Sequence, residues 1–142
     1  MLNHLVAFMN TNPVKLLGYV PAGFPSPASD YMDDGIDLNK KLIQRPSSTF
    51  FFRVEGESMT GAHIPPGAVV IVDKALRPKN NSIVIAVVNG EYTIKFFVKN
   101  QEGMALVPAN PKYKTTVITE GMDFSIWGVV TAVIIETVKY GI

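Results

Sequence analysis

Two side chains of this sequence could together carry out nucleophilic chemistry, Ser58 and Lys95. Ser58 follows a strand-like run that breaks at Gly56. Lys95 lies inside the otherwise apolar, strand-like run 92–98, where a lysine is unusual because burial disfavours its charged form. A lysine that gives up its proton in such surroundings can act as general base for a serine hydroxyl. The pair therefore points to a serine nucleophile that is activated by a lysine.

A predicted hairpin gives the face on which Lys95 lies. Asn89-Gly90 between two apolar runs is typical of a two-residue β-turn, and it pairs Val88 with Glu91. Counting along both strands, Lys95 lies opposite Val84. Because side chains alternate along a strand, we expect Lys95 to share a face with three apolar side chains: Val84, Ala86 and Phe97.

Each residue also has an ordinary explanation. A serine shortly after a glycine is usually a turn residue, and a strand lysine usually extends its amine into solvent. On that interpretation Ser58 and Lys95 are incidental, and the chain is a non-catalytic, dimeric β module that binds partners.

Three motifs, read in order, favour the catalytic interpretation: Gly56-Glu57-Ser58-Met59, the run from Ile64 to Asp73, and the run from Asn89 to Lys95. Their order and spacing resemble the catalytic domain of the LexA/UmuD family of self-cleaving serine/lysine peptidases. The resemblance implies that Ser58 is the nucleophile and Lys95 the base. Backbone N–H groups at Glu57 and Ser58 are the candidates for the oxyanion hole. No metal and no cofactor is expected.

The N-terminal half is similar to the UmuD branch of this family, through Ala22 to Ala28 and Ile36 to Asn39. The resemblance implies an SOS-response protein that is cut between Ala22 and Gly23. It also implies that a RecA filament on single-stranded DNA stimulates the reaction. The truncated product would form a homodimer and serve as accessory subunit of an error-prone, UmuC-type translesion polymerase.

The sequence predicts three segments. Residues 1–22 would be released by cleavage, 23–49 would be an extended arm or linker, and 50–142 would be the peptidase and dimerisation domain. Prolines among Gly, Ser and Ala favour an exposed, extended and partly disordered N-terminal arm. A protease groove can accept such small residues, although the same composition is also typical of an ordinary flexible linker. A short helix is predicted over 37–43, before Pro46.

From Phe50 onward, the residue pattern is that of strands. About seven short strands are predicted, the last over 126–138, with turn residues between them. This pattern predicts a mainly β fold, a curled and largely antiparallel domain, and the resemblance makes it LexA/signal-peptidase-like. Trp127 is expected to belong to the core.

The composition of the chain argues against several classes of function and of binding site. With 142 residues, of which 47% are hydrophobic and 18% charged, the chain has enough apolar residues for one globular core. A net charge of +1 shows no excess of basic residues of the kind that indicates direct nucleic-acid binding. The absence of cysteine excludes thiolate metal sites and is compatible with a cytoplasmic location. The two histidines, His4 and His63, stand in polar contexts that mark neither a base nor a metal site.

The sequence also argues against a targeting signal and against two related functions. The apolar run Leu16 to Val20 is shorter than the roughly 7 to 15 residues of a secretory h-region, and no run is long enough for a membrane helix. A signal peptidase with the same Ser-Lys pair is therefore disfavoured. A LexA-type or phage-type repressor would need a helix-turn-helix, and residues 1–22 are too short to hold one.

Overall fold

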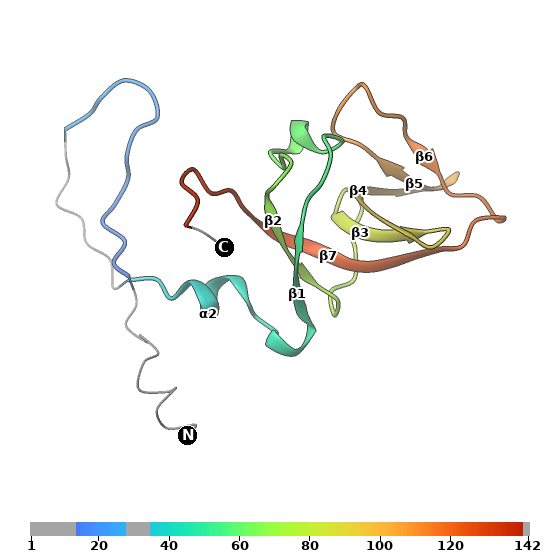
Figure 1. The fold of residues 1–142 in the computed structure, drawn as a ribbon, viewed down its shortest axis with the longest axis horizontal. Coiled ribbons are helices and arrows are strands. Elements are labelled where there is room, and N and C mark those ends of the chain that lie inside the picture. The colour runs from blue at the N-terminus through green and yellow to red at the C-terminus, as the bar shows by residue number, and fades with distance from the viewer. Residues whose placement is uncertain (1–13, 28–34, 141–142) are drawn as a thin grey trace. The chain divides into compact units, whose positions relative to one another are not determined.

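The computed structural model describes residues 14–27 and 35–140, which belong to two units, Met1–Gln44 and Arg45–Ile142 (Figure 1). The first thirteen residues of the predicted segment 1–22, including His4, lie outside the described residues. The functional division of the chain at residues 22 and 49 stays a prediction.

In residues 14–27 and 35–44, the part of the first unit that the structure describes, there is little regular structure. Val14 and Ile36 form an isolated antiparallel bridge. The short helix predicted over 37–43 is present as α2 (Leu38–Leu42). The Asp37 side chain caps it by accepting hydrogen bonds from the backbone N–H groups of Asn39, at 3.0 Å, and Lys40, at 3.4 Å. These are donors that the first turn of a helix leaves without partners.

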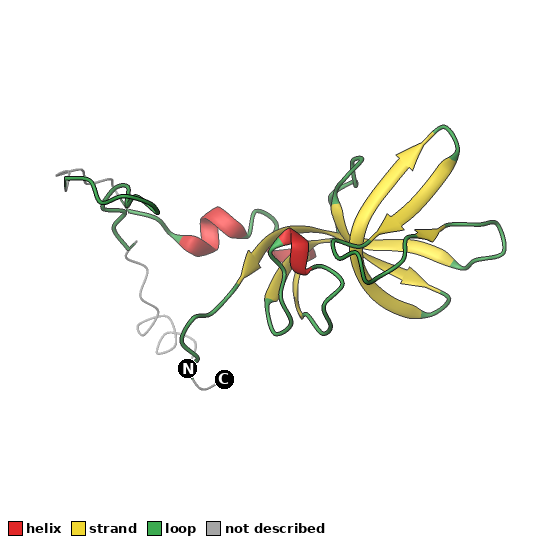
Figure 2. Cartoon of the chain, turned by 90° about the horizontal axis from the view of Figure 1, so that it is seen from above, coloured by secondary structure: helices red, strands yellow, loops and turns green. Residues whose placement is uncertain are grey.

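The second unit consists of seven strands and two short 3₁₀ helices, η1 (Pro46–Ser48) and η2 (Thr60–Ala62). The strands are β1 (Thr49–Arg53), β2 (Val69–Asp73), β3 (Ile83–Val88), β4 (Glu91–Asn100), β5 (Gly103–Val107), β6 (Thr116–Val117) and β7 (Phe124–Ile134). They form one sheet in the order β1-β2-β7-β3-β4-β5-β6, with every neighbouring pair antiparallel. Figure 2 shows how the strands curl around one another. The predicted mainly β, curled antiparallel fold is confirmed.

The β3–β4 hairpin has the predicted register. Asn89 and Gly90 both have positive φ, +49° and +83°, as a two-residue hairpin turn with the right-handed twist of the strands requires. The turn pairs Val88 with Glu91, and four steps further along the hairpin it pairs Val84 with Lys95. The turn chemistry alone therefore determined which residue lies opposite the lysine.

Strand β7 lies in the middle of the sheet, between β2 and β3. Its register shifts once against each neighbour, near Thr131 and near Trp127. Such bulges bend a strand and increase its twist, which helps the sheet to curl. The strand ends at Ile134 rather than at the predicted residue 138. Ile134 pairs with Val69, the first residue of β2, so no partner strand continues beyond it.

Two buried clusters fill the curled sheet. The first consists of Val54, Met59, Ile64, Ala68, Val70, Val72 and Ile85. The second consists of Val84, Ala86, Phe97, Leu106 and Val129. Neighbouring residues of β3 belong to different clusters, so this strand separates the two apolar groups. The segment that carries Ser58 packs on the first cluster, whereas Lys95 extends from the strand pair that carries the second.

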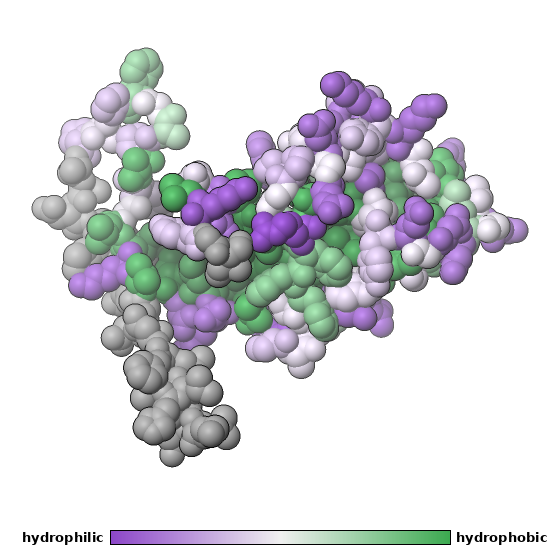
Figure 3. Space-filling view, in the orientation of Figure 1, coloured by the Kyte–Doolittle hydropathy of each residue, from purple (hydrophilic) through white to green (hydrophobic). Residues whose placement is uncertain are grey.

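The aromatic side chains at the β1 end of the sheet surround Trp127. Its ring is edge-on to Phe50, at a centroid distance of 5.2 Å, and to Phe52, at 4.9 Å. Trp127 packs against the first cluster, as predicted. Phe51, on the other face of β1, is 59% exposed. Figure 3 shows hydrophilic and hydrophobic side chains interspersed over the visible face of this unit.

Candidate active site

Ser58 lies in the loop between β1 and β2, and its sequence neighbours determine its position. Gly56 has φ +80°, a conformation that favours glycine, and the chain changes direction there. Met59 is 1% exposed and Ile64 is fully buried, both within the first cluster. Because these residues anchor the loop, the half-buried Ser58 lies at the rim of the core.

Lys95 comes from β4 and reaches the Ser58 loop. Its Nζ lies 2.8 Å from Oγ of Ser58. As the register requires, Lys95 extends from the face of the hairpin that also carries Val84 and Phe97, both of which are buried. The structure thus brings together the two residues that the sequence singled out.

Two further groups surround the amine of Lys95. Its Nζ lies 2.8 Å from Oγ1 of Thr93 and 3.0 Å from the backbone oxygen of Ile94. Sequence reasoning did not single out Thr93. The signal that could have found it is its position two residues before Lys95, which places both side chains on one face of β4. The two oxygens and Ser58 together hold the amine in place.

Burial lowers the pKa of Lys95 below its ordinary value of 10.5, because partial removal from water disfavours the charged ammonium. A nearby carboxylate would act in the opposite direction by stabilising the charge. Within the described residues the one ion pair joins Arg45 and Asp73, and no carboxylate lies within 4.0 Å of Nζ of Lys95. Compared with a lysine in water, the environment thus shifts the protonation equilibrium of Lys95 toward the neutral amine, as the sequence predicted.

A concavity of the second unit contains both Ser58 and Lys95. Its lining is formed by Phe52, Arg53, Val54, Glu55, Ser58, Val70, Ile85, Tyr92, Thr93, Ile94 and Lys95. The lining combines apolar side chains with polar and charged ones, of which Ser58 and Thr93 are hydrogen-bonded to the amine of Lys95. Such a surface could bind a chain segment with small side chains and place one peptide bond near Oγ of Ser58.

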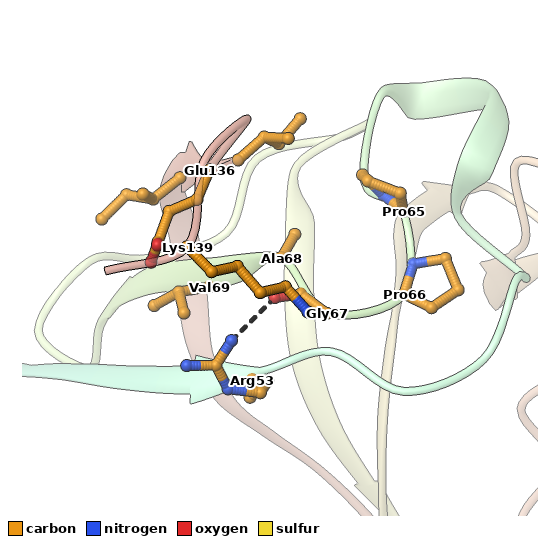
Figure 4. Close-up of a pocket in the computed structure, with 10 residues that line it drawn as sticks. Arg53, Pro65, Pro66, Gly67, Ala68, Val69, Glu136 and Lys139 are labelled. Atoms are coloured by element: carbon orange, nitrogen blue, oxygen red, sulfur yellow. Dashed lines mark hydrogen bonds between the residues drawn. The ribbon is translucent and has the colours of Figure 1, made fainter. Parts of the chain in front are cut away.

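Another concavity lies where the end of β7 meets the loop before β2 (Figure 4). Its lining is formed by Arg53, Pro65, Pro66, Gly67, Ala68, Val69, Ile134, Ile135, Glu136 and Lys139. Arg53 donates a hydrogen bond of 2.9 Å to the backbone oxygen of Gly67 (Figure 4). Because no serine, threonine, tyrosine or cysteine lines this concavity, it offers no nucleophile comparable to Ser58.

The remaining predicted site residues are placed as follows. Glu57 directly precedes Ser58 in the same loop, and the role of its N–H group stays a prediction. Ala22 and Gly23 belong to the first unit, where they lie in an exposed bend. His63, in a left-handed conformation after η2, does not line the concavity of Ser58.

Across residues 14–27 and 35–140, no three His, Asp or Glu side chains converge in a way that could hold a metal ion. In the same ranges, no helix has both the length and the apolar character needed to cross a membrane.

Comparison with known proteins identifies the family. The profile of the family described as Peptidase S24-like matches residues 15–131. Protein SamA of Salmonella typhimurium is 45% identical over 117 residues, which cover 82% of this chain and 81% of that protein. Protein ImpA of the same organism is 41% identical over 82% of this chain and 79% of its own length.

A repressor is also similar. The LexA repressor of Desulfatibacillum aliphaticivorans is 36% identical over 123 residues, which cover 85% of this chain and 60% of the repressor. The match to the family profile covers most of the chain and includes both Ser58 and Lys95. The chain therefore belongs to the Peptidase S24-like family of self-cleaving serine peptidases, which is the LexA/UmuD family that its motifs indicated.

Proposed function

We propose that this protein cuts its own chain once, between Ala22 and Gly23, with Ser58 as nucleophile and Lys95 as general base. The observation that carries the proposal is the 2.8 Å distance between Nζ of Lys95 and Oγ of Ser58. This is hydrogen-bonding distance, as a base needs in order to take the proton of its nucleophile. The lowered pKa of Lys95 supports the same assignment.

The hydrogen bonds around Lys95 suit a neutral amine. A neutral lysine has two N–H bonds and one lone pair. The backbone oxygen of Ile94 can only accept a hydrogen bond, and Oγ1 of Thr93 can accept the second. The lone pair is then left for the hydroxyl proton of Ser58. In this arrangement, Thr93 and Ile94 orient the base toward its nucleophile.

The reaction balances without a metal or a cofactor. Ser58 gives its proton to Nζ of Lys95 while Oγ forms a bond to the carbonyl carbon of Ala22. The bond from that carbon to the nitrogen of Gly23 then breaks, and the Lys95 ammonium returns the proton to the leaving amine. Water, deprotonated by Lys95, hydrolyses the ester on Ser58. One product ends in the carboxylate of Ala22, and the other begins at Gly23.

The negative charge that forms on the carbonyl oxygen of Ala22 needs hydrogen-bond donors. We assign this role to the backbone N–H groups of Glu57 and Ser58. They belong to the loop that carries the nucleophile, so they approach the reacting carbonyl together with Oγ.

We further propose that the cleavage belongs to the SOS response to DNA damage. In this proposal a RecA filament on single-stranded DNA stimulates it in the cytoplasm. The product that begins at Gly23 forms a homodimer and serves a UmuC-type translesion polymerase as accessory subunit. The similarity to the LexA/UmuD family, and the 36% identity to a LexA repressor, support this role.

The test is the intact mass of the purified full-length chain during incubation, with and without RecA filaments. We expect two fragments that meet at the bond between Ala22 and Gly23, formed faster when filaments are present. The matched control is Ser58→Ala, which should keep its full mass under both conditions. A parent chain that keeps its full mass under all conditions would instead indicate a non-catalytic β module.

A further inference from the structure

The segment that follows β5 is hydrogen-bonded to the loop that carries Ser58. The N–H group of Ala109 donates to the backbone oxygen of Ser58 at 2.7 Å, and the N–H group of Gly61 donates to the backbone oxygen of Ala109 at 2.7 Å. These two bonds attach the loop, on both sides of Met59, to a part of the chain far away in sequence. The peptide groups around the nucleophile are thus held from outside the loop as well as by the turn bonds within it.

Asn110 adds a side-chain bond to the same loop. Its Nδ2 donates to the backbone oxygen of Glu57 at 2.9 Å and lies 3.4 Å from Oγ1 of Thr60. At the other end of the amide, Oδ1 accepts a hydrogen bond of 3.0 Å from the N–H group of Lys112. Because that N–H group can only donate, Oδ1 must face Lys112, and the NH₂ group must therefore face Glu57.

Two hydrogen bonds hold the carbonyl of Glu57: the 2.9 Å bond from Asn110 and a longer backbone bond of 3.3 Å from the N–H group of Thr60. The carbonyl of Glu57 and the N–H of Ser58 belong to one planar, trans peptide group, so they point in opposite directions. With the carbonyl held toward Asn110, the N–H is directed away from it. Among the residues that the structure describes, the N–H group of Ser58 has no hydrogen-bond acceptor. It therefore remains free to donate to a substrate.

We propose that Asn110 is a positioning residue for the cleavage reaction. By holding the carbonyl of Glu57, it aims the N–H group of Ser58 at the oxygen that becomes negatively charged in the transition state. Asn110 touches neither Ser58 Oγ nor Lys95 in the structure, so its effect is on the stabilisation of the oxyanion and not on the base. The inference rests on the proposed self-cleavage.

Two substitutions separate this role from a structural one. Asn110→Asp keeps the shape of the side chain and the acceptor for Lys112, but it loses the donor to Glu57. Asn110→Ala removes both bonds. The matched control is Asn100→Ala, because Oδ1 of Asn100 accepts a similar turn bond of 2.8 Å, from the N–H group of Glu102, at a site without contact to the Ser58 loop.

The experiment measures the cleavage rate of each full-length variant as a function of pH, by intact mass, together with the folded fraction by circular dichroism. Loss of one oxyanion donor slows acyl transfer by about 10²- to 10³-fold. Because the donor here is misdirected and not removed, we expect the plateau rate of Asn110→Ala and Asn110→Asp to fall by about 10- to 100-fold. The pH midpoint of Asn110→Ala should equal that of the parent, since Lys95 is untouched. Asn100→Ala should cleave at the parent rate.

Three results would overturn the inference. One is Asn110→Asp with the parent rate. Another is a loss of rate, in both variants, that matches their loss of folded protein, which would make Asn110 purely structural. The third is a shifted midpoint with an unchanged plateau in Asn110→Ala, because that would place the effect on the base. A parent chain that does not cleave would overturn the proposed function together with this inference, whereas an active parent with unaffected variants would overturn the inference alone.

Discussion

The amine of Lys95 lies 2.8 Å from the hydroxyl of Ser58, although the two side chains come from different elements of the fold. Lys95 belongs to the β3–β4 hairpin, and Ser58 belongs to the loop between β1 and β2. Those two strand pairs are joined through β7, which lies between β2 and β3 in the sheet. The distance between base and nucleophile therefore depends on the packing of the whole second unit.

Because the two groups are proposed to act as a unit, each should be indispensable. Ser58→Ala and Lys95→Ala should each abolish self-cleavage about as completely as the double substitution does, as is typical of residues that share one catalytic step. Cleavage is measured by intact mass, and folding by circular dichroism. Appreciable cutting by well-folded Ser58→Ala protein would remove the nucleophile assignment.

The cleavage rate should rise with pH. Only neutral Lys95 can accept the proton of Ser58. Because the pKa of Lys95 is lowered from 10.5, a larger fraction of it is neutral at a given pH than of an ordinary lysine. The rate should climb by about tenfold per pH unit below the folded pKa of Lys95 and become constant above it. The measurement is a rate profile from pH 6 to about 10 on protein shown to stay folded, a range that ends just below the ordinary lysine pKa. A flat profile would contradict a lysine base.

The same lowered pKa makes a prediction about stability. A charged Lys95 is less favourable in the folded state than in the unfolded state, so it destabilises the fold at every pH below its folded pKa. This destabilisation fades between the folded pKa and the unfolded value near 10.5. Lys95→Met should therefore match or exceed the parent in free energy of unfolding at pH 7, and the difference should shrink as pH rises. Urea denaturation of both proteins at pH 7 and at a higher pH tests this. A difference in free energy of unfolding in favour of Lys95→Met that grew with pH would contradict it.

Substitutions at the proposed bond should affect the reaction and not the fold. A Cβ built on Gly23 has no heavy atom within 4 Å, so Gly23→Val can be accommodated without disturbing its surroundings. Its branched side chain should nevertheless crowd the approach of Oγ of Ser58 to the adjacent carbonyl and slow cleavage severely. Ala22→Cys should still be cleaved. N-terminal sequencing of the large fragment identifies the bond, and a first residue other than Gly23 would show that the cut lies elsewhere.

The contact between Gly61 and Ala109 should not tolerate a side chain. A Cβ on Gly61 would lie within 3.0 Å of the backbone oxygen of Ala109, closer than real Cβ atoms approach, so one of the two segments must move. Gly61→Ala should lower the free energy of unfolding by about 1–3 kcal/mol and slow cleavage, because the loop of Ser58 shifts. Gly121→Ala is the control, since its Cβ would meet nothing within 4 Å. Equal stability of the two variants in urea denaturation would contradict this account.

Local patterns in the sequence were sufficient to predict much of the fold. The strands could be predicted because side chains alternate along a strand and because Gly, Pro and Asn punctuate the runs. The register that places Lys95 opposite Val84 follows from the Asn89-Gly90 turn, which leaves no freedom in how the two strands pair. The types of the two reactive residues and the order of their motifs were likewise enough to indicate the peptidase family.

Tertiary structure decided the rest, because non-local contacts leave no periodic signal in the sequence. The end of β7 at Ile134 depends on where β2 begins. The bonds from Ala109 and Asn110 to the Ser58 loop join segments that are far apart in the chain. Thr93 becomes a partner of Lys95 only because the amine turns back along its own strand toward Ser58. The sequence alone determined which groups could do the chemistry, and the packing of β7 between β2 and β3 determined that they meet.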